Sequence, residues 1–93
     1  MNKKKYWYPT RHDFKRVSIG RFAAIKFFSN GVGVIIQKLN YPNLYSITIL
    51  EGSLTSYQIV SGEKILPCLE YKMGFSYYEV RSALRTIQDY VSK

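Results

Sequence analysis

The sequence predicts an α+β domain in which an antiparallel β-meander of about five strands is covered by one C-terminal helix. Between residues 17 and 71, four turn signals separate runs rich in apolar, β-branched and aromatic residues, a pattern typical of consecutive hairpins. Residues 76–92 then change to the apolar spacing of a helix. Because 93 residues with 46% hydrophobic content can build only one core, we expect a single compact domain.

The strands are expected at residues 17–28, 32–39, 44–50, 54–60 and 64–71. Asn30-Gly31 is the strongest turn signal, because both residues tolerate the positive φ that a type I′ hairpin turn requires. In the run 44–50, apolar and polar residues alternate, which predicts one buried and one wet face.

The two outer runs are less regular than the central ones. The run 17–28 also fits a short helix that begins at Gly20. Pro67 lies within the run 64–71 and cannot donate to a β-ladder, so this strand is expected at an edge or with a bulge.

The C-terminal helix is expected over residues 76–92 because it has a complete start signal. Ser76 and Glu79 stand at the spacing of a capping box, in which each side chain accepts a hydrogen bond from the backbone amide of the other. Phe75 and Val80 have the spacing of a hydrophobic staple. One apolar stripe suited to cover a sheet follows at Val80, Leu84, Ile87 and Val91.

Positive charge is concentrated at the N-terminus. The chain has a net charge of +8, and residues 1–26 hold eight Lys or Arg against one Asp. Residues 27–93 hold six basic against five acidic residues. A basic segment on a nearly neutral body attracts a polyanion, or it serves only to keep a small protein soluble.

We interpret residues 1–16 as a basic, aromatic arm and residues 17–93 as the compact domain. Cations contact phosphates and aromatic rings stack on unpaired bases, so the interleaving of both types predicts a nucleic-acid site. The expected contact residues are Lys3, Lys4, Lys5, Tyr6, Trp7, Tyr8, Arg11, Lys15, Arg16 and Arg21. The alternative is that Tyr6, Trp7 and Tyr8 form an additional strand with Trp7 in the core.

Several classes of chemistry lack the residues they need. One histidine, His12, and one cysteine, Cys68, cannot supply the four ligands of a zinc site. The acidic residues have no calcium- or magnesium-loop spacing, so we expect that the protein binds no cofactor and is not an enzyme. No apolar run is long enough for a transmembrane helix or a secretory signal, so we expect that it is not an integral membrane protein. A single thiol, in an apolar setting, fits a cytoplasmic protein.

Three binding functions remain from this composition. The first is a small protein that binds nucleic acid, DNA or RNA, through the basic arm and exposed aromatics. The second is a phage or mobile-element regulator that binds a host protein through a tyrosine-rich surface, since the chain has nine tyrosines. The third is attachment to an anionic membrane surface through residues 3–8, although one short basic patch is a marginal anchor.

Overall fold

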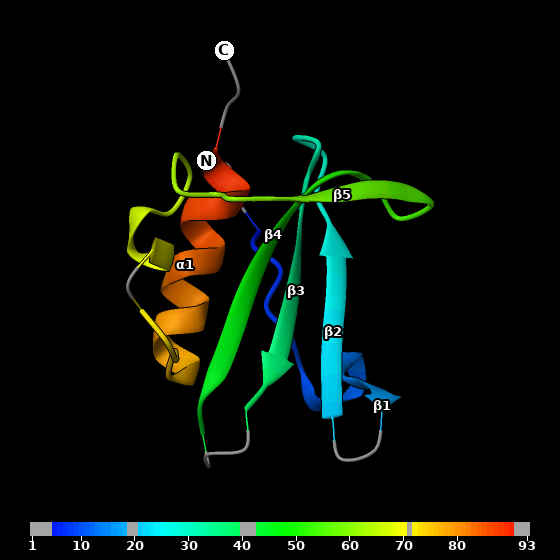
Figure 1. The fold of residues 1–93 in the computed structure, drawn as a ribbon, viewed down its shortest axis with the longest axis vertical. Coiled ribbons are helices and arrows are strands. Elements are labelled where there is room, and N and C mark those ends of the chain that lie inside the picture. The colour runs from blue at the N-terminus through cyan, green and yellow to red at the C-terminus, as the bar shows by residue number, and fades with distance from the viewer. Residues whose placement is uncertain (1–4, 19–20, 40–42, 71, 91–93) are drawn as a thin grey trace.

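A computed structural model describes residues 5–18, 21–39, 43–70 and 72–90 and confirms the α+β class. Five antiparallel strands form one sheet in the order of the sequence, β1-β2-β3-β4-β5. The single helix α1 packs beside the sheet (Figure 1). The elements are η1 (Arg11–Asp13), β1 (Lys15–Ser18), β2 (Arg21–Phe27), β3 (Val32–Lys38), β4 (Tyr45–Ser53), β5 (Ser56–Val60), η2 (Pro67–Glu70) and α1 (Tyr77–Asp89).

Two expected strands are wrong in their details. The run 17–28 is not one strand or a helix: β1 and β2 pair with each other, with a bulge between Arg16 and Ser18. Consequently the expected boundary between residues 16 and 17 falls inside β1. Residues 64–71 form no strand in their described part, because the Gly62 carbonyl accepts hydrogen bonds from the amides of both Ile65 and Leu66, each at 2.9 Å. Pro67, which has no amide to donate, then begins η2.

The turn between β2 and β3 also differs from the expected type I′ geometry. Gly31 has a φ of 83°, but Asn30 does not have a positive φ. The Phe28 amide donates to the Val32 carbonyl at 2.9 Å, which closes a three-residue loop. The Asn30 side chain accepts a hydrogen bond from the Val32 amide and also reaches the end of α1, as described below.

The core lies between α1 and one face of the sheet. Val34, Ile36 and Ile49 from the central strands are essentially inaccessible to solvent. Val80, Leu84 and Ile87 pack on them from the helix, which confirms the expected stripe, while Val91 lies outside the described residues. Burial of each such side chain stabilises the fold by about 1.5–3 kcal/mol.

The start of α1 is confirmed in atomic detail. The Glu79 amide donates to Ser76 Oγ at 3.2 Å, and the Ser76 amide donates to Glu79 Oε1 at 2.8 Å. Lys72 Nζ lies 2.8 Å from Glu79 Oε2. This contact, followed by the hydrogen bond from the Ser76 amide, lowers the pKa of Glu79, so the box is held by a charged carboxylate at neutral pH.

No helix in residues 5–18, 21–39, 43–70 and 72–90 is long and apolar enough to cross a membrane. Within the same ranges, no three His, Cys, Asp or Glu side chains lie close enough together to hold a metal ion.

Candidate nucleic-acid interface

The N-terminal segment, residues 5–10, lies along α1 in the opposite direction to the helix. The Gln88 side chain forms two hydrogen bonds with the backbone of Trp7, one to the amide and one to the carbonyl, each at 2.9 Å. The Tyr77 hydroxyl donates to the Pro9 carbonyl at 2.9 Å. Because Pro9 is itself buried, this segment is part of the packed body of the protein.

The three aromatic residues of this segment are half-buried and form no strand. The Trp7 ring lies 6.1 Å from the Phe28 ring and has Lys26 Nζ 5.9 Å from its centroid. The Arg81 guanidinium lies 4.5 Å above the Tyr8 ring. A base that stacked on Tyr8 or Trp7 would therefore compete with side chains of the protein itself.

The expected cations fall into two groups. Lys3 and Lys4 lie outside the described residues, and Lys5 is exposed beside α1. The other four are exposed on η1, β1 and β2 and are called here the basic edge: Arg11, Lys15, Arg16 and Arg21. Lys15, Arg16 and Arg21 lie on the β1–β2 hairpin, in which Lys15 pairs with Ala23, Arg16 with Phe22 and Arg21 with Ser18 on either side of the bulge. Among the residues that the structure describes, none of the four forms an ion pair.

One residue of the basic edge, Lys15, lines a groove on the sheet face that α1 leaves uncovered. In the ladder, Ile25 pairs with Ile35, and both residues alternate with the core residues of their strands, which places them on this second face. The groove encloses about 500 Å³ and is lined by His12, Asp13, Lys15, Val17, Ala23, Ile25, Ile35 and Tyr57. We call it the open-face groove.

Tyr57 is the functional candidate that the sequence analysis did not single out. Its side chain is 45% exposed, and its ring is supported by the Phe27 ring, with 5.5 Å between the centroids. The only local signal for Tyr57 was its place in an expected strand. Its position beside Lys15 depends on how the sheet curls, because the two residues come from the strands at opposite edges.

Asp13 is the one carboxylate of the groove. Its Oδ2 accepts hydrogen bonds from the Thr10 amide at 2.7 Å and from Thr10 Oγ1 at 3.0 Å. The first of these bonds is the main reason that the pKa of Asp13 is lowered. Asp13 is therefore negative at neutral pH, but its charge is engaged by the hydrogen bonds from Thr10 and is further offset by the positive charge of Lys26.

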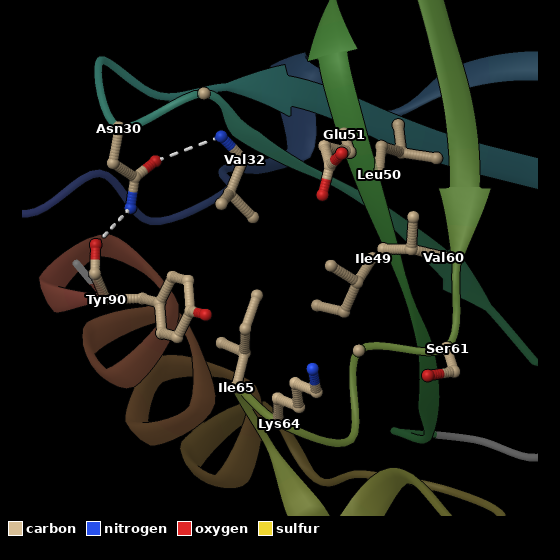
Figure 2. A pocket seen from close by; sticks show the side chains of 12 residues that line it. Asn30, Val32, Ile49, Leu50, Glu51, Val60, Ser61, Lys64, Ile65 and Tyr90 are labelled. Atoms are coloured by element: carbon tan, nitrogen blue, oxygen red, sulfur yellow. Dashed lines mark hydrogen bonds between the residues drawn. The ribbon is translucent and has the colours of Figure 1, made fainter. Parts of the chain in front are cut away.

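A second hollow, at the C-terminal end of α1, has a different chemistry. Figure 2 shows Glu51, Lys64 and Tyr90 around an apolar floor that includes Ile49 and Ile65. It encloses about 350 Å³ and contains none of the ten residues expected to contact nucleic acid. Because one carboxylate balances its one cation, this pocket is a poor phosphate site.

Comparison of the chain with known protein families, curated proteins and solved structures finds no match in any of the three. The geometry of this chain is therefore the basis for a functional assignment.

Proposed function

We propose that this protein binds single-stranded nucleic acid and carries out no reaction on it. The observation that supports this proposal best is the presence of Lys15 and Tyr57 in one groove, with three more exposed cations of the basic edge on η1, β1 and β2. In this assignment the cations of the basic edge contact phosphates, while the Tyr57 ring stacks on an unpaired base in the open-face groove.

Single strands fit this surface better than a duplex does. A base can reach the Tyr57 ring only when it is not paired, because in a duplex the flat faces of the bases are stacked on one another. Tyr57 has an exposed ring with a second ring behind it. By contrast, Lys26 and Phe28 already cover the half-buried Trp7. We therefore assign the stacking role to Tyr57 and a structural role to Trp7.

The phosphate contacts are tested with two double variants that remove equal charge. Arg11→Gln/Lys15→Gln removes Lys15 of the groove and Arg11, which precedes the groove residue His12 in η1. Lys64→Gln/Arg85→Gln removes two exposed cations elsewhere. Anisotropy of labelled single strands at several salt concentrations is the measurement. The first variant should lower the salt slope by about 0.7 for each lost phosphate contact, and the second should resemble the wild type.

The stacking contact is tested with Tyr57→Ala and Tyr57→Phe. We expect Tyr57→Ala to weaken single-strand binding by about 1–3 kcal/mol and to leave duplex binding nearly unchanged, while Tyr57→Phe retains the ring and the affinity. Thermal unfolding of each variant controls for the fold.

Three outcomes would overturn all or part of the proposal. Equal losses in both double variants would mean that net charge alone attracts the strand. Absence of binding to any oligonucleotide at low salt would leave the protein-binding regulator as the better hypothesis. If Arg11→Gln/Lys15→Gln weakens binding but Tyr57→Ala does not, the protein binds the sugar–phosphate backbone of single- and double-stranded nucleic acid alike, and the single-strand assignment is wrong.

A further inference from the structure

The end of β4 and most of β5 form a hairpin that is exposed along its whole length. Each residue from 51 to 59 is exposed, and three of them are large and apolar: Leu54 at 63%, Tyr57 at 45% and Ile59 at 69%. We call residues 51–59 the β4–β5 hairpin. A two-stranded ribbon has little stability in water unless its apolar side chains pack on something, so this hairpin has the character of an interface.

The two edges of the sheet differ in their protection against pairing with another strand. The β1 edge carries Lys15 and Arg16 and is interrupted by a bulge, which are features that block edge-to-edge association. The outer edge of β5 has none of these features. Its five residues, Ser56–Val60, include no charge and no proline, and their pairing with β4 is regular from end to end.

Charge also favours this edge as a contact between two copies of the chain. Each copy has a net charge of +8, so contact through most of the surface brings cations together. The β4–β5 hairpin contains one charged residue, Glu51, and no Lys or Arg. β5 is an edge strand of the sheet, so pairing through its outer edge joins two copies along a segment that carries no Lys or Arg.

We propose that β5 pairs with β5 of a second copy, antiparallel and around a two-fold axis near Gln58. The two sheets join into one, and the same surface of each copy forms the interface, as two-fold symmetry requires. When β5 pairs with β5 of a second copy, both strands have the same length and both lack charged residues. The exposed Ile59 side chain loses water in this contact. The dimer presents two open-face grooves.

The experiment is sedimentation velocity of the full chain over a wide concentration range, without nucleic acid. This makes its result independent of the proposed function. We expect a monomer–dimer equilibrium for the wild type. Ile59→Lys places like charges beside the two-fold axis and should raise the dimer Kd at least about tenfold, equivalent to about 1.4 kcal/mol.

Tyr78→Lys is the matched control, because Tyr78 is 79% exposed and lies in the first turn of α1, outside the hairpin. It adds the same charge and should leave the dimer Kd within about twofold of the wild type, since its lysine is on α1 and not on the β5 edge. Hydrogen exchange of the wild type provides a second measurement that needs no variant. The β5 amides should become more protected as the protein concentration rises.

A wild type that remains monomeric at every concentration would overturn the proposal. So would a dimer whose Kd responds equally to Ile59→Lys and Tyr78→Lys, or one in which β5 exchange does not depend on concentration. A monomer whose β5 amides become protected only when another protein is added would assign the same edge to a different chain.

Discussion

Asn30 joins the β2–β3 turn to the end of α1, and its replacement is the sharpest test of how this fold is held together. Its Nδ2 donates to the carbonyls of Ile87 and Tyr90, each at 3.0 Å, while its Oδ1 accepts from the Val32 amide at 3.1 Å. Figure 2 shows Asn30 between the turn and the helix end. The Ile87 carbonyl also accepts a hydrogen bond from the Tyr90 amide at 3.2 Å, so Asn30 adds a second bond to this carbonyl and one to the carbonyl of Tyr90, just beyond the helix end, where intrahelical partners run out.

The expected cost of Asn30→Ala follows from these three bonds. At about 0.5–1.5 kcal/mol each, they contribute about 1.5–4.5 kcal/mol in total. Because the site is only partly buried and water can replace some of the lost bonds, we expect a loss of about 2–3 kcal/mol in the free energy of unfolding. In a domain of this size that lowers the Tm by about 10–20 °C.

Asn30→Asp distinguishes this geometry from a general effect on the turn. The introduced carboxylate keeps the acceptor for Val32 but faces carbonyls at the negative end of the helix dipole, so its pKa in the folded state is raised. A raised pKa means that stability is present at low pH and is lost as the pH rises through that pKa. Relative to the wild type at each pH, this variant should therefore recover stability in acid, while Asn30→Ala should not.

The assay is urea unfolding followed by circular dichroism from neutral to acidic pH. Ser29→Ala, an exposed neighbour in the same turn, is the control and should change stability by less than about 0.5 kcal/mol. An Asn30→Ala variant as stable as Ser29→Ala would refute the reasoning, since the helix end would then need no partner from the turn.

Two more perturbations test the ends of α1. The lowered pKa of Glu79 means that its contribution is complete above the usual glutamate pKa, about 4.3, and is lost as the pH falls through the folded-state pKa. Glu79→Gln should therefore flatten the acid limb of the stability–pH profile measured by urea unfolding, and an unchanged limb would contradict this. Gln88→Ala removes both bonds to the Trp7 backbone and should shift the emission of this single tryptophan to the red. Arg85→Ala, exposed on the same helix, should leave the emission unchanged.

The parts of the fold that the sequence predicted well depend on neighbours along the chain. The capping box at Ser76 and Glu79 spans four residues, and the structure shows both of its hydrogen bonds. The strand expected at 32–39 is confirmed as β3, Val32–Lys38. Its two signals, the alternation of residue types and the content of β-branched residues, also act between residues close together in the chain.

The errors arose where a tertiary contact competed with a local pattern. Asn30-Gly31 favours a type I′ turn by itself. In the structure the Asn30 side chain bonds to α1, and a hydrogen bond from the Phe28 amide to the Val32 carbonyl closes a three-residue loop instead. The apolar run after Gly62 was expected to be a strand. Gly62, with a φ of 71°, packs so close to Ile49 that there is no room for a side chain, and the run starts there as a helical turn.

In the candidate site, too, local sequence predicted some features and tertiary packing decided others. Composition alone predicted a basic surface with aromatics, and the cations at Arg11, Lys15, Arg16 and Arg21 are exposed together. Packing decided that Trp7 lies against α1 and that Tyr57 joins Lys15 in one groove.

By itself, then, the amino-acid sequence determined the class of fold, the start of α1, the buried stripe on that helix and the concentration of charge at the N-terminus. These follow from residue spacing and composition, which act over a few residues of chain. Only the tertiary structure decided which sheet face stays open, what closes the end of α1 and which edge strand is unprotected. Each of these depends on register and packing between segments that are far apart in the chain, and no local pattern encodes the side chain that a distant segment will present.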